Sequence, residues 1–301
     1  MRITTALSQQ LGVKAILDQQ EELTRTQRQI GTGLRILKPS DDPADSVRVL
    51  DLDQSIKETE QYLANNETAK SRLSLEEITL ASATDVLQRL RELSVQAVNG
   101  SLPAASRVGL EQESRQLLGQ LLGLANTTNA SGEFLFSGFN SLTQSFTGSG
   151  TTPPGGFVYN GDTNQRNLQI GPTRQIADGD FGIAVFGDPS TGNSIFDDVA
   201  RFADNISVAV NTPTQNDITA LDQALDQILT ARANVGARLN ALDQQQELNR
   251  DFILDVQTTL SDVQDLDFAD AISRLNVQTA ALQAAQQAYI RVQNLSLFNF
   301  L

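Results

Sequence analysis

Residues 218–263 read ITALDQALDQILTARANVGARLNALDQQQELNRDFILDVQTTLSDV, and the positions of one seam recur at alternating spacings of three and four. Eleven of the fourteen seam positions are apolar, and the exceptions are Arg232, Gln246 and Asn249. This spacing is typical of an α-helix that buries one narrow face against another helix. A helix of this stretch would be about 69 Å long at ~1.5 Å rise per residue. Such a length predicts a rod-like bundle or a coiled coil rather than an ordinary globular helix.

Both ends of the chain carry helices with thin apolar seams. Near the start, residues 3–31 place apolar side chains at seven-residue intervals, and a last helix is expected to begin after Asp267. Each helix would bury little apolar area alone, so we expect the two ends to pair as an antiparallel coiled coil. Residues 1–40 are net basic and residues 262–301 are net acidic, which is consistent with this pairing. The expected seam and tail residues for assembly are Val13, Ile16, Leu23, Ile30, Leu275, Leu282, Tyr289, Val292, Leu297, Phe298, Phe300 and Leu301.

The helical flanks enclose a segment of different composition. Residues 131–194 hold more than half of the glycines and half of the aromatic residues. We therefore predict a β-type insert, with strands at 133–137, 157–159, 165–170 and 181–186.

Before the insert, Asp42 and Pro43 are typical of a helix start. The sequence then favours helix as far as Val98, and a further helix to about Asn129. A short helix is expected at 195–210.

These patterns predict a mainly α fold, with a long-helix bundle, a terminal antiparallel coiled coil and a small inserted β domain. The expected division has three parts. Residues 1–40 and 265–301 form a terminal coiled-coil domain, residues 41–131 and 195–264 form a helical bundle domain, and residues 132–194 form an outer β domain.

The composition argues against several functions. The chain has no cysteine and no histidine, so disulfides, thiolate chemistry and histidine-based catalytic triads are excluded. The net charge is −14, which is unfavourable for binding nucleic acid. Nothing assembles a nucleophile, a base and an orienting group, so we expect no enzyme activity and no cofactor. The opening residues do not resemble a cleavable signal peptide, and no apolar run is long enough to cross a membrane.

Two local features leave alternatives open. Asp178, Gly179 and Asp180, with Asp162 and Asp188 nearby, suggest a calcium site, but the same residues are the usual components of β-turns, which we favour. The stretch 292–301 ends in apolar and aromatic residues. Either it folds back on its own domain or neighbouring subunits bury it, and we favour burial by neighbours.

Five stretches of the chain form one set of motifs. They are the opening Met1-Arg2-Ile3-Thr4, GTGLRILKPSDDP at 31–43, EFLFSGF at 133–139, ARANVGARLN at 231–240, and the ending Leu295-Ser296-Leu297-Phe298-Asn299-Phe300-Leu301. Together these motifs resemble those of flagellin-like axial proteins, and of the hook-associated protein 3 branch in particular.

The resemblance implies a non-enzymatic subunit of the bacterial flagellum. It implies export of the unfolded chain by the flagellar secretion apparatus without signal cleavage, and an extracellular location. The implied partners are other copies of the chain in a ring, hook-associated protein 1, flagellin, and an export chaperone that binds the C-terminal region. Two alternatives stay open: a filament-forming flagellin, and a ligand- or metal-binding module in the β insert.

Overall fold

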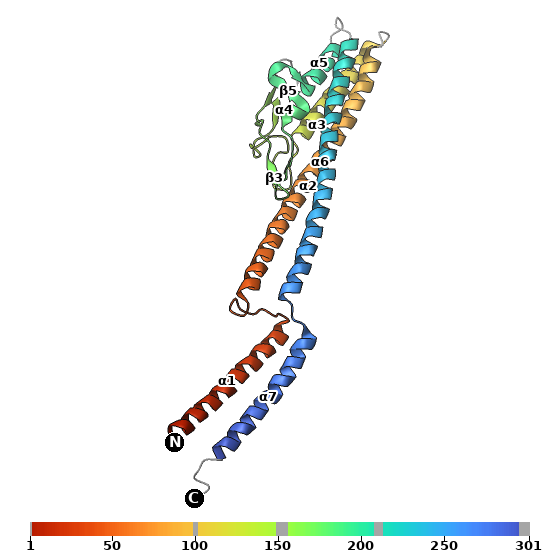
Figure 1. Ribbon diagram of the computed structural model, residues 1–301. Coiled ribbons are helices and arrows are strands. Elements are labelled where there is room, and N and C mark those ends of the chain that lie inside the picture. Colours follow the sequence, from red (N-terminus) through yellow and green to blue (C-terminus); the bar gives the residue numbers. More distant parts are fainter. Residues whose placement is uncertain (1, 99–101, 149–155, 208–212, 295–301) are drawn as a thin grey trace. The chain divides into compact units, whose positions relative to one another are not determined.

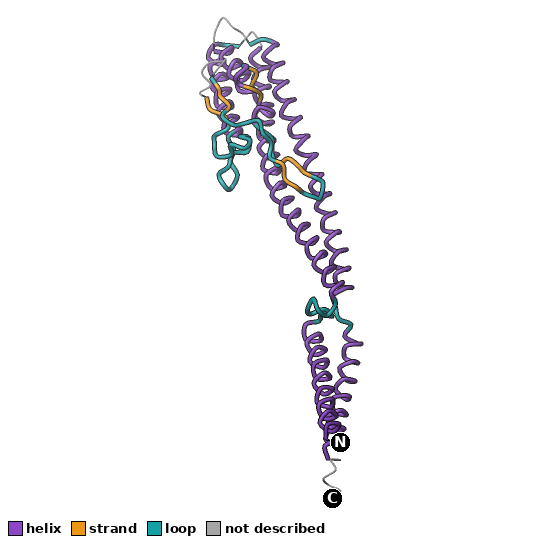
Figure 2. Tube along the Cα trace, turned by 60° about the vertical axis from the view of Figure 1, so that its left-hand side comes forward, coloured by secondary structure: helices purple, strands orange, loops and turns teal. Residues whose placement is uncertain are grey.

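The computed structural model describes residues 2–98, 102–148, 156–207 and 213–294 (Figure 1). The chain forms two compact units. Unit 1 comprises Met1–Glu58 and Phe252–Leu301, and unit 2 comprises Thr59–Asp251. Helices dominate both units and the sheets are small, which confirms the predicted mainly α fold (Figure 2).

Unit 1 contains the two terminal helices side by side (Figure 1). Helix α1 spans Arg2–Thr32 and helix α7 spans Phe268–Asn294. Gly12 in α1 lies against Tyr289 near the end of α7, while Gly33 just after α1 lies near Phe268 at the start of α7. The two helices therefore run antiparallel, as the sequence predicts.

Unit 2 is built on two long helices that run side by side (Figures 1 and 2). Helix α2 spans Pro43–Val98 and helix α6 spans Gln215–Gln264, and both continue into unit 1. Helices α3 (Ala104–Ala125) and α5 (Ile195–Ser207) lie next to each other beside them (Figure 1). Leucine, isoleucine, valine and alanine side chains of these four helices form most of the buried core.

The three polar exceptions in the α6 seam each have a partner on another element. The guanidinium of Arg232 pairs with Glu77 of α2 at 2.7 Å. Gln246 donates to the carboxylate of Glu67, and the Asn249 amide donates to the carbonyl of Ile170 at 3.0 Å. These positions are polar because they hold α2 and the insert on α6, not because the helix pair is interrupted there.

The insert consists of short antiparallel hairpins with one small helix. Its sheets are two-stranded, and the pairs are β1 with β2, β3 with β4 and β5 with β6. The tip of the β3–β4 hairpin reaches the long helices, since Asn65 of α2 donates to the Gln169 carbonyl at 2.7 Å. The bounds are β1 Phe146–Gly148, β2 Phe157–Tyr159, β3 Asn167–Gln169, β4 Gln175–Ala177, α4 Gly182–Phe186, β5 Gly187–Asp188, η1 Pro189–Thr191 and β6 Asn193–Ser194.

Two predicted strands are wrong. Residues 133–137 form turns with one isolated bridge, because the carbonyls of this stretch accept hydrogen bonds from a side chain of α2, as described below. The apolar run 182–186 is a helix, and short apolar runs do not distinguish strand from helix.

The extent of the helix before the insert also differs from the prediction. Helix α3 ends at Ala125, four residues early, because the Asn126 side chain exchanges two hydrogen bonds with the backbone of Phe146.

Phenylalanine rings form the part of the core beneath the insert. The Phe196 ring lies 4.9 Å from Phe146, 5.5 Å from Phe157 and 5.6 Å from Phe186, measured between centroids. Gly182 fits against this cluster only because it has no side chain, since a Cβ there would stand 2.6 Å from the Phe146 ring. The insert is therefore held by large buried rings rather than by extensive strand pairing.

Candidate functional site: the terminal helix pair and its joints

The seam between α1 and α7 is thin and partly polar. Thr26 and Gln29 are buried on α1, and Ala271 is fully buried on α7. At the other end, the Tyr289 ring would stand 3.1 Å from a Cβ at Gly12, so the small residue admits the ring. Small and polar side chains bury little apolar area, so this pair gains little from the hydrophobic effect.

Six of the twelve predicted seam and tail residues are half-buried on α1 and α7. They are Ile16, Leu23, Ile30, Leu275, Leu282 and Tyr289. Val13 is 42% exposed and lies outside the seam, because its neighbour Gly12 occupies the position facing α7. Val292 lies in α7, but its side chain is outside the described part of the structure, as are Leu297, Phe298, Phe300 and Leu301.

Arg35, in the turn after α1, contacts both the end of α6 and the start of α2. Gly33 ends α1 with φ +75°, a conformation that favours glycine. The Arg35 amide then donates to the Gln264 carbonyl at 2.7 Å, and its guanidinium donates to the Val263 carbonyl at 2.8 Å. The same guanidinium pairs with Asp45 at 2.5 Å, and this hydrogen bond lowers the pKa of the Asp45 carboxyl.

The two aspartates of the same motif shape the start of α2. The Asp41 carboxylate accepts the backbone amides of Leu37 and Lys38, which closes the loop before the helix. The Asp42 carboxylate accepts the Asp45 amide at 3.1 Å and caps the helix that begins at Pro43, as predicted. The stretch 31–43 therefore ends α1, binds the C-terminal end of α6 through Arg35 and starts α2. We call this stretch the joint.

Unit 1 has many exposed large hydrophobic side chains and few buried ones. Among the described residues it holds five of the 39 buried hydrophobic residues but 12 of the 20 large hydrophobic residues that are exposed. On α1 the exposed ones are Leu7, Leu11, Val13 and Leu17. Concentrated exposed apolar surface marks sites of protein–protein contact. We therefore regard the terminal helix pair as the candidate functional site.

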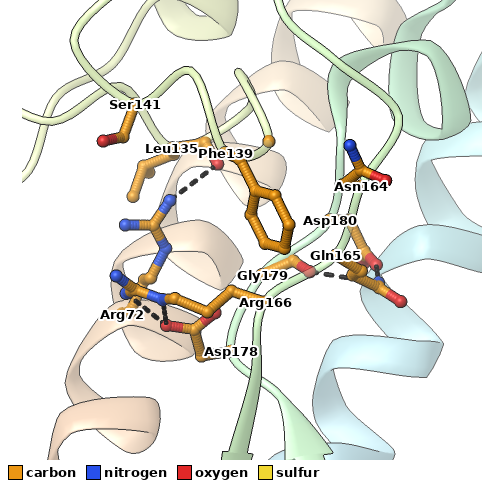
Figure 3. Close-up of a pocket in the computed structure, with 11 residues that line it drawn as sticks. Arg72, Leu135, Phe139, Ser141, Asn164, Gln165, Arg166, Asp178, Gly179 and Asp180 are labelled. Carbon is orange, nitrogen blue, oxygen red and sulfur yellow. Dashed lines mark hydrogen bonds and ion pairs between the residues drawn. The ribbon is translucent and has the colours of Figure 1, made fainter.

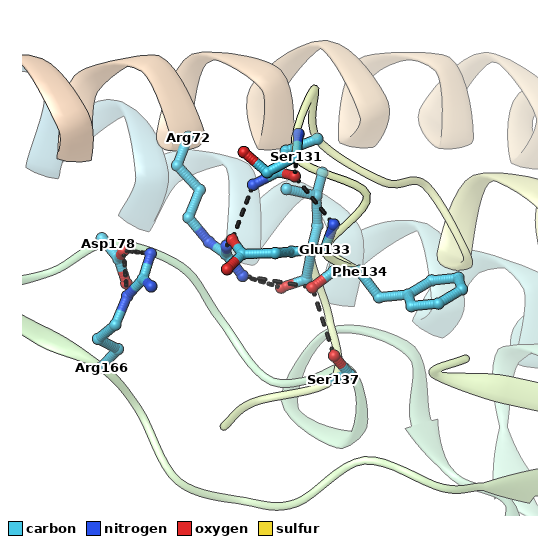
Figure 4. Close-up of polar contacts among 9 residues, drawn as sticks. Arg72, Ser131, Glu133, Phe134, Ser137, Arg166 and Asp178 are labelled. Carbon is cyan, nitrogen blue, oxygen red and sulfur yellow. Dashed lines mark hydrogen bonds and ion pairs between the residues drawn. The ribbon is translucent and has the colours of Figure 1, made fainter. Parts of the chain in front are cut away.

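In unit 2, Arg72 anchors the insert to α2. Its side chain is nearly buried and pairs with Glu133 at 3.2 Å, while it also donates to the carbonyls of Phe134 and Leu135 (Figure 4). Glu133 is held in turn by the Asn129 amide at 2.8 Å. The stretch 133–139 thus joins the insert to the helical core.

A small polar pocket of about 170 Å³ lies beside this anchor (Figure 3). Its charged side chains are already paired with one another or with their neighbours. Arg166 donates to the buried Asp178 at 2.7 Å, and Asp180 pairs with Arg238 of α6 at 2.7 Å. In the described part of the chain no group of three or more acidic side chains is placed to hold a metal ion. The Arg166–Asp178 pair lies within the insert, and the Asp180–Arg238 pair joins the insert to α6.

Glu76 of α2 lies buried under the same loop. Burial raises the pKa of Glu76 to about 8, and the negative charge of Asp180 adds to the rise, although Arg238 and Arg72 oppose it. Gly179 allows the loop to approach this closely, because a Cβ there would stand 3.2 Å from Nε of Arg72. The carboxyl is therefore largely protonated at neutral pH.

The Glu76→Gln variant is expected to be more stable than the wild type at pH 8.5. The folded chain holds the Glu76 proton more tightly than the unfolded chain, so stability is lost as the pH rises from the ordinary glutamate range to about 8. The neutral amide removes this loss, and we expect a gain of more than ~1.4 kcal/mol, the equivalent of one pKa unit. Urea denaturation at pH 4.5 and pH 8.5 measures it, with the gain confined to the higher pH.

Glu77→Gln is the matched control for this prediction. Glu77 is the next residue on α2 and pairs with Arg232. Its neutralisation removes an ion pair and should lower stability, or leave it unchanged, at pH 8.5. A gain at pH 8.5 that is equal in the two variants would contradict the assignment to buried Glu76.

Sequence reasoning missed Arg35, Arg72 and Arg238 as contact residues. Two of them stand in motifs that carry the resemblance, and Arg72 lies four residues before Glu76 in a helix. An arginine next to apolar seam positions is a signal for such a contact residue. The sequence does not identify the contact, because the partners of these arginines lie on elements that are distant along the chain. Among the described helices, none is long and apolar enough to span a membrane.

Comparison with known proteins places these features in a family. The bacterial flagellin N-terminal helical region matches residues 3–141. Flagellar hook-associated protein 3 of Escherichia coli is 30% identical over 99% of this chain and 99% of its own length. Flagellin FlaB2 of Treponema pallidum is 30% identical over 86% of this chain and 87% of its own.

A solved structure agrees with this assignment. The crystal structure of hook-associated protein 3 from Legionella pneumophila is similar with a TM-score of 0.64 at 25% identity, over 70% of this chain and 98% of that one. The full-length match to the Escherichia coli protein decides between the two groups of relatives. This chain belongs to the flagellar hook-associated protein 3 family.

Proposed function

We propose that this chain is a structural subunit of the bacterial flagellum that forms the junction between the hook and the flagellin filament. On the hook side it contacts hook-associated protein 1, and on the other side it contacts flagellin. The chain acts by burying surface between subunits and not by catalysis. The single observation that carries the proposal is the excess of exposed apolar side chains in unit 1, which has few buried ones.

The terminal helix pair supports a role in assembly. The buried positions of the seam are threonine, glutamine and alanine, and its isoleucines and leucines are only half-buried, so the pair is weakly stabilised in isolation. Burying the exposed leucines of α1 against neighbouring copies would supply the missing stabilisation. A contact between two different surfaces of identical subunits repeats around an axis and generates a ring or a tube, as a junction requires. The seam residues predicted from the sequence are the proposed contacts.

Export and chaperone binding follow from the same proposal. The subunit is taken to leave the cell unfolded through the flagellar secretion apparatus, without signal cleavage, and to end outside the cell. A chain without cysteine forms no disulfide that would trap it during passage. The apolar segment 295–301 is the expected target of an export chaperone, which would cover it before assembly.

Electron microscopy of a strain that lacks this chain tests the proposal. We expect bare hooks, with flagellin secreted into the medium instead of polymerised on the cell. Re-expression of the chain should restore filaments. Normal filaments on cells without the chain would contradict the junction role.

A filament-forming flagellin is the second candidate, favoured by the match to the flagellin N-terminal region. The two functions differ in polymerisation. A flagellin grows long filaments by itself from a seed, whereas a junction subunit ends growth after a short ring. Long filaments grown from the purified chain alone would favour the flagellin function.

A further inference from the structure

A separate apolar groove lies in unit 1, next to the joint between the helices. It is formed by the loop after α1, the first turns of α2 and the end of α6, and its volume is about 170 Å³. An engineered cavity of about 150 Å³ with apolar walls binds a benzene ring. The groove therefore has room for one aromatic side chain. The residues that line it are Ile36, Leu37, Lys38, Pro39, Ser46, Val49, Leu50 and Gln264.

Two features of the wall indicate that the groove is incomplete in the free chain. Leu50 is 65% exposed, so one apolar wall faces water. Ser46 is buried, 9% exposed, and its hydroxyl has no hydrogen-bond partner among the described residues. A buried hydroxyl without a partner destabilises the folded chain. An occupant that brings both an apolar ring and a polar group would relieve both defects.

Residues 295–301 offer this combination within one short stretch. They read Leu-Ser-Leu-Phe-Asn-Phe-Leu, so aromatic and aliphatic side chains alternate with a hydroxyl and an amide. By contrast, the exposed leucines of α1 bring no aromatic ring. The side chain of Ser296 or Asn299 can pair with the Ser46 hydroxyl while a phenyl ring fills the groove.

The occupant must come from another copy of the chain. The groove lies at the start of α7, since Gln264 lines it and α7 begins at Phe268. Helix α7 has 27 residues and carries its far end about 40 Å away. The seven residues after Asn294 span at most about 25 Å when fully extended. A chain therefore cannot fill its own groove with this segment.

We propose that segment 295–301 of one subunit docks in the Ile36–Leu50 groove of a neighbouring subunit, with the ring of Phe298 or Phe300 in the groove. This inference rests on the proposed function, because it requires copies to lie next to one another in the flagellum. It assigns the apolar end of the chain to a particular surface of the neighbour and makes the contact heterologous.

Disulfide cross-linking between subunits tests the contact, because the chain contains no cysteine of its own. The variant Leu50→Cys/Phe298→Cys is expressed in a strain that lacks the wild-type chain, and isolated flagella are oxidised and run on a non-reducing gel. A disulfide forms only where the two Cα atoms approach within about 7 Å. We expect dimers and larger oligomers to predominate. Leu37→Cys/Phe300→Cys is a second pair for the same contact.

Val47→Cys/Phe298→Cys is the matched control. Val47 lies on the same helix one turn before Leu50 and is 59% exposed, but it does not line the groove. Its cross-links should stay at background. Flagella that contain the variants but show no cross-linking above this control would overturn the docking while leaving the junction role intact. If the wild-type chain were absent from purified flagella, that result would contradict both the proposed function and this inference.

Discussion

A chain that lacks residues 268–301 is expected to keep unit 2 folded and to fail to enter flagella. Helix α7 is the main partner of α1 within the described part of unit 1. Its removal exposes the half-buried side chains of Ile16 and Leu23 and deletes eight of the twelve proposed contact residues. Unit 2 should be unaffected, because its core is contributed by residues 59–251.

Two measurements on the truncated chain test this expectation. Circular dichroism should show less helix but a retained cooperative thermal transition from unit 2. Immunoblots of purified flagella should show no incorporated chain, although the wild type expressed at the same level is incorporated. Truncated chains found in flagella at the wild-type level would refute the role of the terminal helix pair.

Phe196→Ala should be the most damaging single substitution in unit 2. The ring is fully buried and lies within 6 Å of three other rings, so its loss leaves a large cavity in the core beneath the insert. Truncation of a buried phenylalanine costs about 3–5 kcal/mol of unfolding free energy. Urea denaturation followed by circular dichroism should show the unfolding free energy of unit 2 lowered by that amount, with the midpoint of its transition at a lower urea concentration.

Phe139→Ala is the control for this loss. Phe139 also belongs to the insert, but its ring is 59% exposed. Its replacement should change stability by no more than about 0.5 kcal/mol, as is usual for surface sites. Equal losses for the two variants would mean that the aromatic cluster does not hold the insert.

The long helices could be predicted from the sequence because their signal is repeated many times. The seam at 218–263 predicts α6 to within three residues at each end, and the Asp42-Pro43 cap places the start of α2. The antiparallel pairing of α1 and α7 follows from the thin seams at both ends. Each of these inferences depends on the periodic spacing of apolar residues, which can be recognised in the sequence without knowledge of distant contacts.

The insert could not be predicted equally well, because its structure depends on distant partners. The run 182–186 became a helix and residues 133–137 became a turn anchored by Arg72. Strands of two or three residues carry too little alternation to be recognised. The choice between Gly12 and Val13 at the seam likewise depends on a close approach of Tyr289 that spacing alone does not reveal.

Amide hydrogen exchange in the free chain and in assembled flagella tests the central claim most directly. In dilute free chain, the amides of α1 and α7 should exchange much faster than those of α2 and α6 within residues 59–251. In isolated flagella, the amides of α1 and α7 should become protected, because neighbouring subunits cover the exposed leucines. Equal protection of α1 and α7 in the free chain and in flagella would contradict the account, since the terminal pair would then be stable without neighbours.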